Sequence, residues 1–454
     1  MDQVFKAYDV RGTVPDQLDA DMCLAIGRAM ARFAEAPEIL VARDMRPSGV
    51  ELSQAFSDGV RAEGVEVTDL GLASTDFLYF AAGHLDAPGA MFTASHNPAR
   101  YNGMKLCLSG ARPIGRDTGL AEIQADAEKL DGEPVPPLTG GRRELDLLGE
   151  WADHVVSFVD VASLRPLKVV ADTANGMGGL VVPIVFERLP FEIEILYPEL
   201  DGSFPNHPAD PIQPENLVDL KKAVLERGAD IGLAFDGDAD RVFLVDENAD
   251  PVSGSLTTAL VAASMLTKHP GEKILYNLIC SHVVPETVTA MGGTPVRTQV
   301  GHSFIKKVMA ETGAVFGGEH SGHYYYRDNF RADSGIITAL VVLELLSKSG
   351  RPLSALLEPY RRYADSGEIN TEVDDPTATV AAMVEAERAA GAAVDLLDGM
   401  TVEYDEWWYN VRPSNTEPLL RLNVEARTPE LCAAHVAEVQ KLIVTHSASP
   451  AENK

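Results

Sequence analysis

Residues 229–247 read ADIGLAFDGDADRVFLVDE. Residues 231–235 form a short apolar run, typical of a buried β-strand, and the helical pattern ENLVDLKKAVLERG at 215–228 lies just before it. Strands that alternate with helices build parallel or mixed sheets covered by helices. The stretch therefore predicts an α/β fold, with an acidic loop at the end of one of its buried strands.

The same alternation of short apolar runs and helical patterns extends outward from this stretch. Apolar runs occur at 39–42, 65–70 and 90–92, with helical patterns at 19–36 and 49–64 between them, and the rhythm restarts near residues 167 and 272. These repeats indicate three related α/β domains of about 100 to 150 residues each.

The pattern changes in the last part of the chain. An alanine-rich helical segment at 378–393 is followed by strand-like segments at 400–414 and 417–426, then by a closing helical pattern at 429–446. Helices and hairpin strands in this order predict a small α+β domain. Segments rich in proline, glycine and charge suggest the boundaries, so we expect domains at 1–143, 144–249, 250–364 and 365–454.

Composition excludes several classes of protein. The 454-residue chain is 45% hydrophobic and has a formal net charge of −30, so most of its surface repels nucleic acid. No apolar run approaches the length of a membrane span, and the N-terminus has no export signal pattern. The four cysteines are far apart, which argues against a zinc site or a disulfide framework and leads us to expect a cytoplasmic protein.

The acidic loop is the strongest chemical signal. Asp236, Asp238 and Asp240 recur at every second position, and three clustered carboxylates repel one another unless a cation neutralises them. Oxygen ligands of this kind suit a hard cation such as Mg²⁺. The alternative is an acidic turn in solvent. Arg241, the next residue, is a candidate counter-charge or phosphate contact.

A second loop follows the apolar run at 90–92. Residues 91–103 read MFTASHNPARYNG, in which Asn-Pro favours a turn and Ser95 is a candidate nucleophile. The alternative is an ordinary surface turn. Lys105, across the turn, could neutralise an anion, and Arg11 in the segment YDVRG is a further candidate.

A third loop, residues 317–328, reads GGEHSGHYYYRD. Glu319, Ser321 and His323 alternate along it and are suitable partners for sugar hydroxyls. Nearby, the segment QVGHSFIKK contains His302, a further candidate substrate contact, together with two lysines that we interpret as the solvated basic face of a helix start.

A fourth loop lies in the stretch YNVRPSNTEPLLRL, residues 409–422. Its arginine fork, two hydroxyls and amide could hold a phosphate or carboxylate, and the alternative is a polar hairpin loop. The four candidate residues are Arg412, Ser414, Asn415 and Thr416. One polar loop in each proposed domain suggests a single central cleft shared by all four.

The segments TASHNP, DGDADR, GEHSGH and RPSNTEP, in this order, resemble the motifs of the α-D-phosphohexomutase family, and most closely its phosphomannomutase/phosphoglucomutase group. The resemblance implies three related α/β domains with mixed sheets and a C-terminal α+β domain around a central cleft. It also implies a phosphohexomutase, in the isomerase class, that acts on small hexose phosphates as a monomer or homodimer.

The resemblance further implies roles for the candidate residues. Ser95 would carry a phosphoryl group, and Mg²⁺ would be held by the three aspartates and an oxygen of the phosphoserine. Transfer would pass through a hexose 1,6-bisphosphate, with Lys105 and Arg241 neutralising charge. Arg11, Lys105 and His323 would be the general acid or base candidates. Glu319 and Ser321 would bind the 3- and 4-hydroxyls of the sugar, and the fourth loop would bind its distal phosphate.

Two further residues bear on which hexose phosphate is the substrate. His320 lies between Glu319 and Ser321, and the resemblance implies mannose phosphates there without excluding glucose phosphates, because some members of the family assigned to mannose phosphates have histidine at this position. Ala239 in the metal loop stands where the glucosamine enzymes of the family usually have glycine, so the resemblance argues against glucosamine. We expect a phosphomannomutase. The alternatives are a phosphoglucosamine mutase and a phosphosugar-binding protein without turnover.

Overall fold

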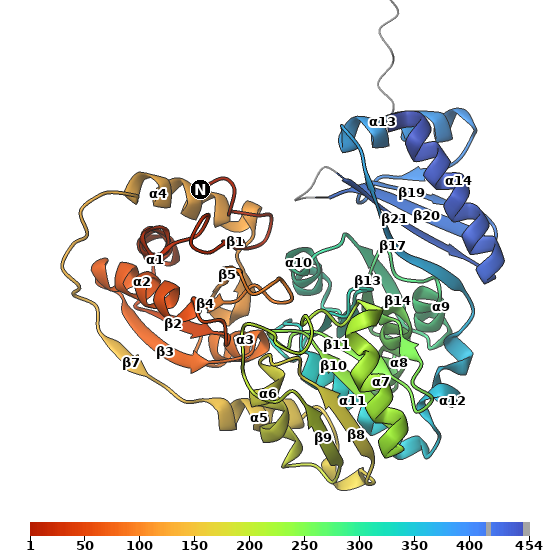
Figure 1. The fold of residues 1–454 in the computed structure, drawn as a ribbon, viewed down its shortest axis with the longest axis horizontal. Helices are drawn as coiled ribbons and strands as arrows, with labels where there is room; N and C mark the ends of the chain where they lie inside the picture. Colours follow the sequence, from red (N-terminus) through yellow and green to blue (C-terminus); the bar gives the residue numbers. More distant parts are fainter. Residues whose placement is uncertain (415–418, 448–454) are drawn as a thin grey trace, which may run out of the picture.

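A computed structural model describes residues 1–414 and 419–447 of the chain. Within these residues the chain forms four β-sheets, each with its own helices, and the sheets follow one another along the sequence (Figure 1). The first three sheets contain both parallel and antiparallel pairs of strands, and the fourth is antiparallel throughout. The predicted fold class is therefore confirmed.

The first sheet has the strand order β1-β5-β4-β2-β3-β7, with β6 paired to β5. Its strands are β1 (Val10–Thr13), β2 (Glu38–Arg43), β3 (Glu66–Leu72), β4 (Gly89–Phe92), β5 (Tyr101–Leu108), β6 (Arg112–Pro113) and β7 (Arg142–Glu144). The helices around it are α1 (Ala20–Ala34), α2 (Gly49–Ala62), α3 (Thr75–His84) and α4 (Leu120–Leu130), with short 3₁₀ turns at Ser109–Ala111 and Arg116–Thr118.

Two glycines allow α1 and α2 to pack closely. A Cβ atom at Gly27 would lie 2.1 Å from the carbonyl oxygen of Phe56, and one at Gly59 would lie 2.1 Å from that of Leu24. Larger residues would push the two helices apart, because the obstructing atoms belong to the backbone.

The second sheet has the order β12-β11-β10-β8-β9, in which β10 runs parallel to β8 and antiparallel to β11. Its strands are β8 (Lys168–Asp172), β9 (Glu192–Leu196), β10 (Ile231–Phe235), β11 (Val242–Val245) and β12 (Pro251–Val252). Its helices are α5 (Leu148–Val156), α6 (Gly178–Phe186) and α7 (Val218–Arg227), with 3₁₀ turns at Val161–Ser163 and Pro214–Leu217.

The third sheet has the order β14-β13-β15-β16. Its strands are β13 (Lys273–Asn277), β14 (Thr294–Thr298), β15 (Phe316–Gly318) and β16 (Tyr324–Tyr326). The associated helices are α8 (Gly254–Lys268), α9 (Val283–Ala290), α10 (His302–Thr312), α11 (Gly335–Ser349) and α12 (Leu353–Leu357), followed by a 3₁₀ turn at Glu358–Tyr360. Ser334 caps α11 by accepting the backbone N–H of Ile337, as expected for a serine at a helix N-cap.

The fourth sheet has the order β17-β21-β20-β19-β18. Its strands are β17 (Ala364–Glu372), β18 (Val394–Asp395), β19 (Met400–Glu403), β20 (Trp407–Pro413) and β21 (Leu419–Ala426), with α13 (Pro376–Ala389) and α14 (Pro429–Ser447) as its helices. This domain has its own apolar core, whereas one continuous core joins the second and third sheets to the α3 side of the first. The first three domains are therefore packed together more intimately than the fourth is packed onto them.

The domain boundaries stated above remain proposals. Strand β7 pairs with β3 and spans the proposed first boundary, and β12 completes the second sheet just beyond the proposed second boundary.

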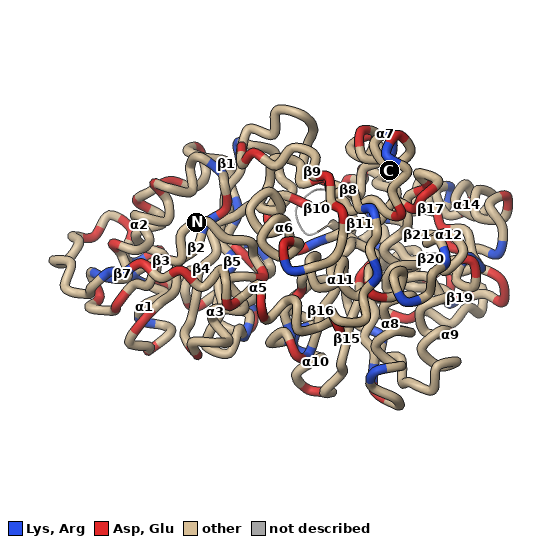
Figure 2. The backbone as a smooth tube through the Cα atoms, turned by 90° about the horizontal axis from the view of Figure 1, so that it is seen from below, with Lys and Arg blue, Asp and Glu red and all other residues tan. Residues whose placement is uncertain are grey.

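Acidic residues are spread over the whole backbone (Figure 2). No helix within the described part of the chain is both long enough and apolar enough to span a bilayer.

Candidate active site

Ser95 lies three residues beyond the end of β4, in a left-handed backbone conformation with φ of 48°. Its N–H donates to the Thr93 hydroxyl at 2.9 Å, and its side chain is buried, with the residue 5% exposed. The hydroxyl donates to Asp236 Oδ2 at 2.7 Å and accepts from the Arg241 guanidinium at 3.3 Å. The buried strand therefore ends by presenting a hydroxyl directly to the acidic loop of the second domain.

A buried arginine that the sequence did not single out holds the Ser95 loop. Arg46 follows β2, is completely buried, and pairs with Asp44 at 3.2 Å. Burial raises the pKa of Asp44 to about 6, although the charge of Arg46 opposes that shift. The guanidinium donates to four backbone carbonyls of the loop, those of Ser95, Asn97, Pro98 and Tyr101, at 2.6 to 3.0 Å. The planar fork of arginine suits this arrangement, which fixes the loop shape.

We expect Arg46→Met to destabilise the protein by about 3–5 kcal/mol, because it leaves the Asp44 carboxylate buried without its partner and four carbonyls without their donor. Urea unfolding followed by circular dichroism would measure the change. Arg32→Met is the control, since Arg32 pairs with Glu63 at a partly exposed site where the loss should not exceed about 1 kcal/mol. Equal losses for the two variants would contradict the role of Arg46.

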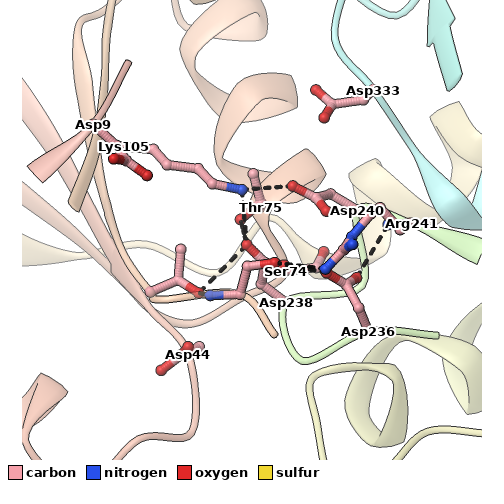
Figure 3. A network of polar contacts seen from close by, with 12 residues as sticks. Asp9, Asp44, Ser74, Thr75, Lys105, Asp236, Asp238, Asp240, Arg241 and Asp333 are labelled. Atoms are coloured by element: carbon pink, nitrogen blue, oxygen red, sulfur yellow. Dashed lines mark hydrogen bonds and ion pairs between the residues drawn. The ribbon is translucent and has the colours of Figure 1, made fainter. Parts of the chain in front are cut away.

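The three aspartates of the acidic loop lie between β10 and β11 and are fully buried, and their ligand atoms lie within 4.8 Å of one another (Figure 3). Lys105 on β5 reaches across from the first domain to Asp238 at 2.9 Å and Asp240 at 2.6 Å. Arg241 pairs with Asp236 at 2.9 Å. Three carboxylates face two cationic side chains here, so full ionisation of the cluster would leave one negative charge in excess.

The electrostatics of the acidic loop fit a cation. Burial raises the pKa of Asp236 well above its ordinary range; Arg241 opposes this shift, and the other two carboxylates reinforce it. Burial also disfavours ionisation of Asp238, but the Lys105 ammonium and the Thr75 hydroxyl outweigh it and lower its pKa. Asp238 Oδ1 and Asp240 Oδ1 are buried and have no hydrogen-bond partner among the described residues. Free carboxylate oxygens beside excess negative charge are the ligands that a hard divalent cation requires.

Arg11 contacts the Ser95 loop from β1. Arg11 on β1 donates to the Asn97 side chain at 2.6 Å and pairs with Asp9. A Cβ atom at Gly103 would lie 2.1 Å from the carbonyl oxygen of Val10, so this glycine lets β1 approach β5.

His96 Nδ1 lies 3.3 Å from the Ser95 hydroxyl, and burial holds the pKa of His96 well below its ordinary value, which keeps the ring neutral.

The third loop joins the acidic loop through His323. The backbone of His323 pairs with that of Arg241 in a single antiparallel β-bridge, and the Nε2 atom of His323 lies 3.8 Å from Asp240 Oδ1. Its Nδ1 lies 3.0 Å from the Ser321 hydroxyl and 3.6 Å from the Glu319 carboxylate.

Glu319 is buried at the end of β15, where its carboxylate accepts from the Tyr325 hydroxyl at 2.7 Å, from Asn277 at 3.2 Å and from the Gly301 N–H at 3.1 Å. These bonds hold the carboxylate in one orientation beside His323.

The interpretation of the basic residues near His302 was partly wrong. Lys306 is only 2% exposed; its ammonium lies 2.8 Å from Asp333 and 3.6 Å from the centre of the Tyr79 ring. It faces inward because the start of α10 packs against the first domain rather than against water. Lys307 is exposed, as expected. His302 is half-buried with its ring against Tyr8, and burial holds its pKa well below its ordinary value.

In the fourth loop, Arg412 is buried at the end of β20, where its guanidinium donates to Asn423 at 2.9 Å and to Glu368. Ser414 accepts from Arg421 at 3.5 Å. Arg421, on β21, also lies 3.6 Å from Glu368, so it is a second cation beside this loop, and nothing in the sequence pattern singles it out. The other two predicted residues, Asn415 and Thr416, lie outside the described residues.

Tyr8 lies where the loops of three domains approach one another. Its hydroxyl donates to the carbonyl of Val300 at 3.4 Å. Burial, together with the nearby carboxylates of Asp398, Glu319 and Asp9, raises its pKa to about 12, and Arg412 opposes that shift. The third and fourth loops are thus within electrostatic reach of one side chain of the first domain.

Family models match the chain in four consecutive parts. They are described as phosphoglucomutase/phosphomannomutase alpha/beta/alpha domains I, II and III and C-terminal domain, and they match residues 2–133, 149–250, 253–363 and 368–442.

Known proteins are similar over nearly the whole chain. A phosphomannomutase of Salmonella montevideo is 41% identical over 449 residues, covering 97% of this chain and 98% of the relative. The phosphohexose mutases of Xanthomonas campestris are 42% identical over 425 residues, covering 93% of this chain and 95% of the relative. The crystal structure of a phosphoglucomutase/phosphomannomutase family protein from Burkholderia thailandensis superposes with a TM-score of 0.90 at 32% identity, covering 100% of this chain and 99% of that one.

Proposed function

This chain belongs to the phosphoglucomutase/phosphomannomutase family, and we propose that it is a phosphomannomutase that interconverts mannose 6-phosphate and mannose 1-phosphate, with glucose phosphates as a second substrate pair. The observation that carries the proposal is the position of the Ser95 hydroxyl, 2.7 Å from Asp236 and 3.3 Å from Arg241, at the edge of the buried acidic cluster.

The proposed reaction moves a phosphoryl group between Ser95 and a hexose. The bond between phosphorus and Ser95 Oγ breaks and a bond to a hexose hydroxyl oxygen forms. The hexose hydroxyl proton passes to a nearby group, and Ser95 Oγ takes up a proton and becomes a hydroxyl again. Arg11, Lys105 and His323 remain our candidates for that group. The product is a hexose 1,6-bisphosphate, which must turn over so that its other phosphoryl group returns to Ser95.

The side chains of the site suit this chemistry. Phosphoryl transfer depends on neutralising charge and aligning the reacting oxygens more than on a strong base. Arg241 places a positive charge 3.3 Å from the Ser95 hydroxyl, and Lys105 places a second positive charge on Asp238 and Asp240 of the acidic loop. We propose that Mg²⁺ is held by Asp236, Asp238, Asp240 and an oxygen of the phosphorylated Ser95. The ion would supply further neutralisation of the phosphoryl oxygens when bound.

We propose that the sugar is held away from Ser95 by the third and fourth loops. Glu319 and Ser321 would bind ring hydroxyls, with His323 and His302 as further contacts. Arg412 and Ser414, together with Asn415 and Thr416, would bind the phosphate that is not reacting. A clamp on the remote phosphate converts binding energy into alignment at the reacting phosphorus.

We expect Arg412→Lys to raise the KM for mannose 1-phosphate about tenfold and also to lower kcat, because lysine keeps the charge but loses the bidentate fork that aligns the substrate. Steady-state kinetics would measure both constants. Arg427→Lys serves as the control, since Arg427 lies over the Tyr363 ring and outside the proposed site. An unchanged KM in Arg412→Lys would contradict the assigned phosphate contact.

The proposed function is tested by parallel assays with mannose 1-phosphate, glucose 1-phosphate and glucosamine 1-phosphate, each with Mg²⁺ and the matching 1,6-bisphosphate as activator. We expect the highest kcat/KM with mannose 1-phosphate. Highest efficiency with glucosamine 1-phosphate would identify a phosphoglucosamine mutase instead. Tight binding of a hexose phosphate without turnover of any substrate would indicate a phosphosugar-binding protein.

We further propose that the protein is cytoplasmic and acts as a monomer or homodimer. All four cysteines are free and buried, which suits a reducing compartment.

A further inference from the structure

The turn at residues 74–76 joins β3 to α3 and contacts both other α/β domains. The Thr75 hydroxyl donates to Asp238 Oδ2 at 2.6 Å, and the Thr75 N–H donates to the backbone carbonyl of Asp238 at 3.1 Å. The next residue, Asp76, accepts from the hydroxyl of Ser334, the N-cap residue of α11, at 2.7 Å. The turn is thus fixed against the second domain, through the contact of Thr75 with Asp238 (Figure 3), and against the third domain, through Asp76.

The two oxygens of the Asp238 carboxylate have different surroundings. Oδ2 accepts from Thr75 at 2.6 Å, from Lys105 at 2.9 Å and from Thr93 at 3.3 Å. Oδ1 is buried and has no hydrogen-bond partner in the part of the chain that the structure describes. Three donors occupy the bonding capacity of Oδ2, so Oδ1 is the oxygen left for a cation.

Thr75 is the donor best placed to set this orientation. Lys105 is shared between Asp238 and Asp240 on a long side chain, and Thr93 also accepts the Ser95 N–H while its bond to Asp238 is the longest of the three. Thr75, by contrast, is fully buried in the first turn of α3 and binds Asp238 through both its hydroxyl and its backbone. The Thr75 N–H holds the backbone of Asp238, and the Thr75 hydroxyl holds one carboxylate oxygen, so the carboxylate cannot rotate without breaking the hydroxyl bond.

We propose that Thr75 is a positioning residue for the divalent cation: its hydroxyl binds Asp238 Oδ2 and so directs Oδ1 toward the ion. The inference rests on the proposed function only in requiring a cation at the three aspartates. Groups that orient metal ligands through the ligand's other oxygen or nitrogen commonly change metal affinity 10- to 100-fold when they are removed.

The test is direct calorimetric titration of the full-length protein with Mg²⁺ alone. We expect Thr75→Val, which keeps the shape of the side chain but removes the hydroxyl, to weaken Mg²⁺ binding at least about tenfold. Thr75→Ser restores the hydroxyl and should stay within about threefold of the wild type. Thr338→Val is the matched control, because Thr338 is also fully buried and hydrogen-bonded, to Tyr326, away from the acidic loop.

Kinetics supply a second readout. With Thr75→Val, kcat should return to within about threefold of the wild-type value at saturating Mg²⁺, and the KM for mannose 1-phosphate at that concentration should be unchanged. If Thr75→Val fails to fold, Thr75→Ala provides the same comparison with a smaller side chain.

Wild-type Mg²⁺ affinity in Thr75→Val, or equal weakening in Thr75→Val and Thr75→Ser, would overturn the inference while leaving the mutase proposal intact. Turnover of hexose phosphates without any Mg²⁺ binding by the wild type would overturn the cation site and this inference together. Mg²⁺ binding without turnover would instead count against the proposed function alone.

Discussion

Replacing Ser95 with alanine is expected to lower kcat with mannose 1-phosphate at least about 10⁴-fold, since the variant lacks the oxygen that would carry the phosphoryl group. Folding should be almost unaffected. The Ser95 hydroxyl binds Asp236 and Arg241. Because these two side chains also bind each other at 2.9 Å, both keep a partner when the hydroxyl is removed. Steady-state kinetics and thermal unfolding, measured on the same preparation, separate the two effects.

Ser109→Ala is the control for the Ser95 variant, because Ser109 lies in the short 3₁₀ turn that follows β5, whereas the Ser95 loop precedes that strand. It should keep full activity. Turnover by Ser95→Ala within about tenfold of the wild type would mean that the phosphoryl group does not pass through this serine.

Replacing Asp240 with asparagine should lower kcat about 10²- to 10³-fold and abolish the stabilisation that Mg²⁺ gives the wild type, because one of the three carboxylates is lost. The ion-free protein should lose little stability. Lys105 keeps Asp238 as a partner at 2.9 Å, Arg241 keeps Asp236, and the excess negative charge of the cluster disappears. A ligand that binds the native state alone raises the unfolding temperature, so thermal unfolding with and without Mg²⁺ measures the effect.

Asp246→Asn is the matched control for Asp240→Asn. Asp246 is also fully buried, at the end of β11, but it accepts from the backbone N–H groups of Asn248 and Asp250 and lies outside the acidic loop. Its replacement should cost stability and leave the Mg²⁺-dependent shift unchanged. A Mg²⁺-dependent shift that survives in Asp240→Asn would contradict the proposed cation site.

The alternation of elements was predictable because both ends of most elements carry local signals. The apolar run at 39–42 lies in β2, which is one residue longer at each end, and the run at 90–92 lies in β4, which begins one residue earlier. The closing helix, α14, ends one residue later than expected. The strand β5 was not predicted. Its first residues, Tyr-Asn-Gly, resemble a turn, and the strand is buried on both faces, so it lacks the alternation of a half-buried strand.

The acidic loop and the serine loop were predictable as separate features, since three alternating carboxylates and a serine beside Asn-Pro are unusual in themselves. Their contact was expected only from the joint pattern and the resemblance, because 141 residues separate Ser95 from Asp236. The residues that hold the site gave no such signal. Arg46 and Thr75 look like ordinary loop residues, and their roles arise from burial against distant segments. The same cause explains Lys306, which was expected in solvent and pairs with Asp333 instead.

The central claim is that Ser95 carries the phosphoryl group between the two positions of the sugar. Intact-mass measurement with peptide mapping, before and after mannose 6-phosphate is added to the full-length protein, tests it most directly. The account predicts one phosphoryl group per chain, on Ser95, that is lost as an equivalent amount of mannose 1,6-bisphosphate forms. A phosphoryl group at another residue, or Ser95 unmodified throughout turnover, would contradict it.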